Sequence, residues 1–111
     1  MEIIQRELNS IPIIEVIGEI DLYNTKDLKD IIDKMIQQKK YNIILNLKDV
    51  PFIDSSGIGT IVTSMYKLQK YNGNLKISNI YGSVAKVFKI THINTSIEIF
   101  QNDEEAVNSF L

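Results

Sequence analysis

The segment Asp54-Ser55-Ser56-Gly57 places a carboxylate, two hydroxyls and a glycine side by side, the densest polar chemistry in the sequence. It follows the apolar run Ile43–Leu47 and precedes apolar residues with helical spacing. It is therefore predicted to join a buried strand to a helix. Ligands and partners of open α/β sheets gather at the carboxyl ends of the strands. This position favours a functional role for the segment.

Two interpretations of the segment need no reaction at a serine. Asp54 or a serine can cap the helix, because a side-chain oxygen there accepts a free backbone N–H, and Gly57 and Gly59 can allow close packing of the helix on the sheet. The pair Gly57-x-Gly59 also has a superficial likeness to a phosphate-binding loop. That match is poor, because no third glycine and no Gly-Lys-Ser/Thr follows.

Two further interpretations use a serine hydroxyl. A hydrolase nucleophile is disfavoured, because Gly-x-Ser-x-Gly is absent and the lone histidine, His92, would have to act as the base. A phosphoacceptor fits better. Phosphate on Ser55 would meet the backbone N–H groups and the positive dipole at the start of the helix. It would also add about −1.5 to −2 charge beside Asp54, and near Asp21, which changes how a partner docks.

Composition narrows the functional class. The 111 residues predict a single domain, residues 1–111, with 44% hydrophobic and 23% charged residues and a net charge of −2. Arg6 is the only arginine and no basic run occurs, so direct nucleic-acid binding is not expected. The absence of cysteine and the single histidine predict no metal site and no cofactor. No signal peptide and no membrane-length apolar run is found, so a cytoplasmic location without membrane contact is expected.

Periodicity along the chain predicts alternating strands and helices. Two strands joined at Asn9-Ser10 are expected to pair in an antiparallel manner. Asn24 is predicted to cap the first helix with Asp27 as its partner, and Ser83 to cap the third. The expected strands are Ile3–Leu8, Ile13–Ile20, Ile43–Leu47, Leu75–Ile80 and Ile97–Ile99, and a terminal helix is expected over Asp103–Phe110, capped by Asn102 or Asp103. Right-handed crossovers would then put most helices on one face of a mixed sheet.

These motifs resemble those of STAS domains, specifically the anti-sigma factor antagonists of bacterial partner-switching systems. The segment Asp49–Gly59 is similar to the phosphorylation segment of that family, and Gly18–Asp21 is similar to a second family marker. The resemblance covers nearly the whole chain. It implies an α/β fold, a STAS-like mixed sheet of four to five strands with three to four helices mainly on one face.

The resemblance also implies a function without catalysis. A serine kinase that is itself the anti-sigma factor would phosphorylate Ser55, and a PP2C-type phosphatase would remove the phosphate. Only the unphosphorylated protein would bind the anti-sigma factor and free the sigma factor. The family implies partner contacts around this serine, at Asp21, Asp54, Ser56, Gly57 and Ile58.

One alternative from the same resemblance stays open. STAS domains also act in stressosome-like assemblies, in anion transporters, as lipid-transport accessories and as modules that bind nucleotides. The acceptor serine in this chain favours the phosphorylation switch over a module that binds its partner regardless of Ser55.

Overall fold

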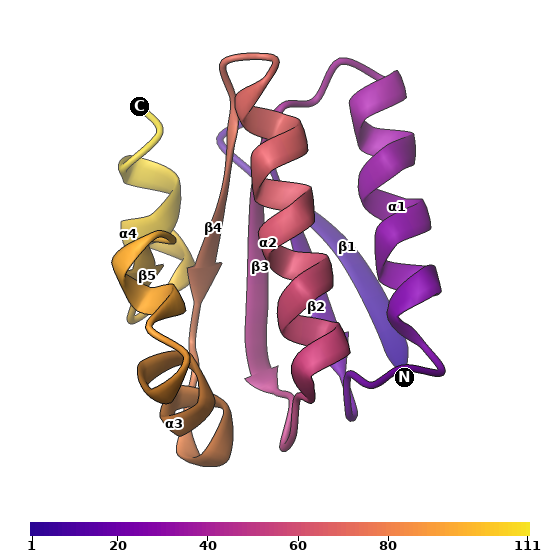
Figure 1. Ribbon diagram of the computed structural model, residues 1–111. Helices are drawn as coiled ribbons and strands as arrows, with labels where there is room; N and C mark the ends of the chain where they lie inside the picture. Colours follow the sequence, from indigo (N-terminus) through magenta and orange to yellow (C-terminus); the bar gives the residue numbers. More distant parts are fainter.

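Five strands form one mixed sheet in the order β1-β2-β3-β4-β5 in the computed structural model, which describes residues 1–111 (Figure 1). β1 pairs antiparallel with β2, and all further pairings are parallel. The strands are β1 (Glu2–Leu8), β2 (Ile11–Ile17), β3 (Asn42–Asp49), β4 (Asn74–Ser78) and β5 (Ile99–Phe100). The helices are α1 (Thr25–Gln37), α2 (Ser55–Gln69), α3 (Gly82–Ile90), the 3₁₀ turn η1 (Ile93–Thr95) and α4 (Asp103–Asn108). The predicted α/β class is confirmed.

The first two strands form the predicted hairpin. Asn9 and Ser10 have φ angles of +50° and +66°, and Leu8 lies opposite Ile11. Two-residue hairpin loops of type I′ need positive φ at both central positions, because only that twist matches the twist of the strands. The hairpin thereby pairs β1 with β2, and the parallel part of the sheet begins where β2 pairs with β3.

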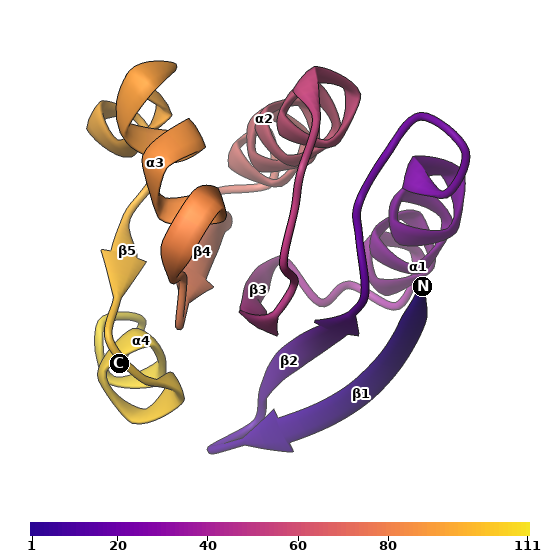
Figure 2. The ribbon, with the colours of Figure 1, turned by 90° about the horizontal axis from the view of Figure 1, so that it is seen from below.

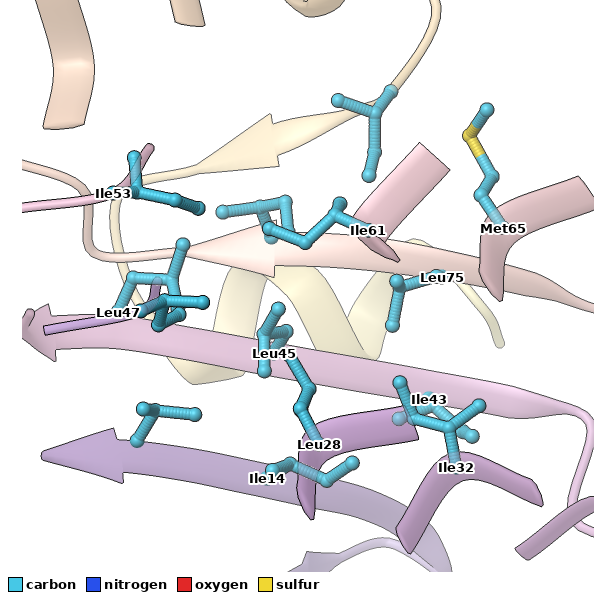
Figure 3. Close-up of a cluster of buried hydrophobic side chains, with 14 of the residues drawn as sticks. Ile14, Leu28, Ile32, Ile43, Leu45, Leu47, Ile53, Ile61, Met65 and Leu75 are labelled. Carbon is cyan, nitrogen blue, oxygen red and sulfur yellow. The ribbon is translucent and has the colours of Figure 1, made fainter. Parts of the chain in front are cut away.

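Three helices cover one face of the sheet, as predicted: Figure 2 shows α1, α2 and α3 on one side and α4 on the other. Figure 3 shows Leu28 and Ile32 of α1 and Ile61 and Met65 of α2 among the buried apolar side chains of the helices and strands. They belong to a cluster of 20 buried hydrophobic residues. None of the helices has both the length and the hydrophobicity that a membrane crossing requires.

The opposite face is partly covered by α4. Ala106 and Val107 pack against Ile13 and Ile44 in a second, smaller apolar cluster. This cluster holds only four buried residues, so α4 buries little apolar surface against the sheet.

Polar contacts add to the attachment of α4. The Asp103 carboxylate accepts hydrogen bonds from Arg6 Nη2 (2.7 Å), Ser78 Oγ (2.7 Å) and Asn46 Nδ2 (2.9 Å). Burial raises the pKa of Asp103, but the hydrogen bonds from Arg6, Ser78 and Asn46 outweigh it and hold the pKa below its ordinary value. A single carboxylate of α4 thus joins β1, β3 and β4.

Several predicted strand ends are wrong by two or three residues. β2 ends at Ile17 rather than Ile20, because Gly18 turns the chain with φ +104°, and Ile20 forms only an isolated bridge with Ile53. β4 ends at Ser78 rather than Ile80, since Asn79 has φ +57°. The last strand lies at Ile99–Phe100 rather than Ile97–Ile99.

The predicted caps of the last two helices have different outcomes. Asn102 caps α4 by accepting the N–H of Glu105, as expected. Ser83 does not cap α3, because the helix already begins at Gly82. The Ser83 hydroxyl instead donates to the carbonyl oxygen of Pro51, which ties α3 to the segment after β3.

Candidate functional site

Asp54 is the N-cap of α2 and organises the start of that helix. Its Oδ1 accepts the N–H of Gly57 at 2.9 Å and the hydroxyl of Ser56 at 2.5 Å. By accepting from Gly57, the Asp54 carboxylate satisfies a backbone N–H that a helix start leaves free. The Ser56 hydroxyl, followed by the Gly57 amide, lowers the pKa of Asp54. Asp54 is therefore a carboxylate whose geometry is fixed by its own helix.

The same carboxylate binds the loop between β2 and α1, residues 18–24, called here the β2–α1 loop. Asp54 Oδ2 accepts the N–H of Leu22 at 3.1 Å. The backbone N–H of Asp54 donates to Ile20, and the N–H of Ile20 donates to Phe52. The β2–α1 loop and the start of α2 are consequently one connected structure.

Internal hydrogen bonds also hold the β2–α1 loop. Asn24 Oδ1 accepts the N–H of Asp21 at 2.9 Å, and Asn24 Nδ2 donates to the carbonyl of Glu19 at 2.7 Å. Asn24 occupies the N-cap position of α1, as predicted. Its side chain faces back into the loop and makes no capping hydrogen bond, so the predicted capping pair with Asp27 does not form. The Asp21 carboxylate accepts the N–H of Tyr23. Asp21 and Asp54 thus lie at the same corner of the molecule.

The two serines of this corner differ in environment. Ser55, the first residue of α2, is exposed, and its hydroxyl makes no hydrogen bond within the chain. Ser56 is half-buried, and its hydroxyl donates to Asp54. Only the hydroxyl of Ser55 is both accessible and uncommitted, so the geometry distinguishes two residues that the sequence places side by side.

Gly57, Ile58 and Gly59 all lie inside α2, so the two glycines do not form a phosphate-binding loop. Gly57 is buried, and a Cβ atom there would lie 2.6 Å from Ile53 Cγ1 and 2.9 Å from Ile20 Cγ2. A Cβ atom at Gly59 would meet nothing within 4 Å. Ile58 is partly buried against the main core. Of the two glycines, only Gly57 allows the close packing that the sequence suggested.

The remaining sequence candidate for acid–base chemistry lies elsewhere. His92 is exposed, has φ +57° and begins the turn η1. No hydrogen bond joins it to Ser55 or Ser56. The structure thus provides no serine–histidine pair of the kind that nucleophilic catalysis requires.

Leu22 and Tyr23, on the β2–α1 loop, were not singled out by the sequence patterns. Both are among the exposed large hydrophobic residues, and neither packs against either core cluster. The sequence feature that could have identified Leu22 and Tyr23 is their position: two apolar residues between Asp21 and Asn24, outside any periodic segment.

Comparison with known proteins identifies the family. Residues 2–106 match the STAS domain family. The anti-sigma-B factor antagonist of Bacillus subtilis (strain 168) is 30% identical over 94 residues, covering 85% of each chain.

Solved structures share the fold. An anti-sigma factor antagonist from Mycobacterium paratuberculosis superposes with a TM-score of 0.87 at 17% identity, over 97% of this chain and 92% of that one. The anti-sigma factor antagonist SpoIIAA gives 0.77 in its unphosphorylated form, at 23% identity over 98% of this chain and 97% of its own. SpoIIAA of Bacillus in the phosphorylated form gives 0.76, at 23% identity over 99% of this chain and all of its own. The family match and the Bacillus subtilis relative together show that the chain belongs to the STAS domain family.

Proposed function

We propose that this protein is an anti-sigma factor antagonist whose binding to its partner is switched by phosphorylation of Ser55. The observation that carries the proposal is the exposed, uncommitted hydroxyl of Ser55 at the start of α2, beside Asp54. Membership of the STAS family and the named function of the Bacillus subtilis relative support it.

The position of Ser55 lets a phosphate change the surface without breaking the fold. A phosphate on the first residue of a helix faces free backbone N–H groups and the positive end of the helix dipole. The Ser55 side chain has no bond within the chain that the modification would break. SpoIIAA gives nearly the same TM-score to this chain in its two forms, which agrees with a fold that tolerates the group.

The effect on docking is electrostatic. The phosphate adds about −1.5 to −2 charge to a corner that already holds the carboxylates of Asp54 and Asp21. A partner that covers this corner must desolvate that charge or face its repulsion. A hundredfold loss of affinity corresponds to only about 2.7 kcal/mol, which one covered phosphate can supply.

The proposed cycle has three components besides this protein: a serine kinase that is also the anti-sigma factor, the sigma factor it releases, and a PP2C-type phosphatase. The chain itself acts as a binding protein and not as a catalyst, and residues 1–111 act as one STAS domain in the cytoplasm. Asp21, Asp54, Ser56 and Ile58 are proposed to form the contact surface around Ser55, while the buried Gly57 supports it from beneath.

The test is phosphorylation by the serine kinases of the native organism, with radiolabelled ATP and the purified protein. Incorporation should vanish in Ser55→Ala and persist in Ser56→Ala, a matched control with the same loss of one hydroxyl. The phosphorylating kinase should bind the unmodified protein and bind Ser55→Asp more weakly. Labelling that persists in Ser55→Ala would overturn the assignment of the acceptor. Equal affinity for the parent and Ser55→Asp would instead favour a STAS module that binds its partner regardless of Ser55.

A further inference from the structure

Leu22 and Tyr23 expose apolar surface that the fold itself does not use. Their exposed fractions are 69% and 92%, the latter the highest among the large hydrophobic residues that are exposed. Two other exposed tyrosines have partners within the chain: Tyr71 stacks on Tyr41 with ring centres 4.7 Å apart, and the hydroxyl of Tyr81 accepts a hydrogen bond from the amide of Asn79. The side chains of Leu22 and Tyr23 have no such contact.

The backbone beneath these two side chains is nevertheless held firmly. The N–H of Leu22 donates to Asp54 and the N–H of Tyr23 donates to Asp21. Asn24 bridges Asp21 and Glu19 across the base of the β2–α1 loop. Side chains on a backbone that is already ordered lose less entropy on binding. Tyrosine is also enriched among the residues that dominate interface energies.

The position of the pair relative to the switch indicates what covers it. Leu22 is bonded directly to Asp54, the residue before the acceptor Ser55, so a protein that contacts Ser55 also reaches the β2–α1 loop. The pair is flanked by the acidic side chains of Glu19, Asp21 and Asp54. The complementary surface is an apolar pocket with basic groups at its rim.

We infer that Leu22 and Tyr23 are the apolar anchor by which this protein docks on the kinase that phosphorylates Ser55. The inference rests on the proposed function and adds the residues and the chemistry of the partner pocket. The anchor contributes to kinase affinity whether or not Ser55 is phosphorylated, while the phosphate on Ser55 causes the difference in affinity between the two forms.

The test measures binding of the phosphorylating kinase to Leu22→Ala and Tyr23→Ala by calorimetry. Tyr23→Ala should weaken binding by about thirtyfold, the lower limit for truncating a dominant interface residue, and Leu22→Ala by about tenfold. Both positions are exposed, so the fold and the melting temperature should not change. Matched controls are Ile90→Ala on α3, at a side chain 75% exposed, and Tyr66→Ala on α2, at one 54% exposed; both should bind like the parent.

Phosphorylation kinetics give a second measurement. Loss of a docking contact that is equal in the ground state and the transition state raises KM for the protein substrate and leaves kcat unchanged. If Tyr23→Ala and Leu22→Ala bind and react like the parent while the parent binds the kinase, the anchor is overturned and the switch at Ser55 stands. If the unsubstituted protein neither binds nor is phosphorylated by any kinase, the proposed function falls and the anchor with it.

Discussion

The two glycines of α2 should respond in opposite ways to the same substitution. In Gly57→Ala the new Cβ would lie 2.6 Å from Ile53 Cγ1 and 2.9 Å from Ile20 Cγ2. Both neighbours are buried and β-branched, so neither can rotate away freely. Overpacking of this kind costs about 1–3 kcal/mol, and replacing a helical glycine returns up to ~1 kcal/mol. The net result is a loss of stability of about 1 kcal/mol.

Gly59→Ala should instead raise stability by up to ~1 kcal/mol, because the methyl group meets nothing within 4 Å and only the helix propensity changes. The two variants should therefore differ by about 2 kcal/mol in their free energy of unfolding. At about 4 °C or more per kcal/mol for a domain of this size, they should melt roughly 8 °C apart. Thermal and urea unfolding followed by circular dichroism measures both. A Gly57→Ala protein as stable as the parent, or a destabilised Gly59→Ala protein, would refute the packing argument.

Three other substitutions test the contacts that hold the remaining parts together. Asp103→Asn should lower stability at neutral pH by about 1–3 kcal/mol in urea unfolding, because it removes a charged hydrogen bond to Arg6. The difference in stability between Asp103→Asn and the parent should shrink in acid. The pKa of Asp103 is lower in the folded than in the unfolded protein, so the carboxylate stabilises the fold fully above the unfolded pKa of about 3.9. This stabilisation is lost as the pH falls through the folded pKa. Gly73→Ala should cost more than about 3 kcal/mol in the same assay, because the added Cβ would overlap the carbonyl of Tyr41. Asp54→Ala should cost about 0.5–2 kcal/mol through loss of the cap on α2 and should speed hydrogen exchange of the Leu22 amide.

Matched controls distinguish these effects from general surface changes. Glu104→Gln alters a neighbouring exposed carboxylate of α4 that has no ion pair and should leave stability and its pH dependence unchanged. Gly59→Ala is the control for Gly73→Ala. If Asp103→Asn lowers stability equally at all pH values, the role given to the carboxylate charge is contradicted. If hydrogen exchange of the Leu22 amide is unchanged in Asp54→Ala, the proposed link between α2 and the β2–α1 loop is contradicted.

The sequence was sufficient for features that depend on neighbouring residues. The first helix and the hairpin turn at Asn9-Ser10 both follow from local geometry. Features that depend on side-chain contacts outside the helix itself could not be predicted from the sequence. Ser83 does not cap α3 but donates to Pro51, 32 positions earlier in the chain. Asn24 turns toward Glu19 because a hydrogen bond within its own loop competes with the helix cap.

The same limit applies to the site. The sequence indicated that Asp21 and Asp54 lie near Ser55, but it could not show that the carboxylate of Asp54 binds both its own helix and the backbone of Leu22. Spacing also could not separate the two glycines, since their difference depends on the side chains of Ile20 and Ile53 on other segments.

The bond between Arg6 and Asp103 has a consequence for synthesis on the ribosome. It joins residues 97 positions apart, and the partners of Asp103 on β3 and β4 emerge long before Asp103 does. Nascent chains that have exposed only the first hundred residues therefore leave Ile13 and Ile44 without their cover. Until translation passes α4, these two isoleucines are available to chaperones or to other unfinished chains.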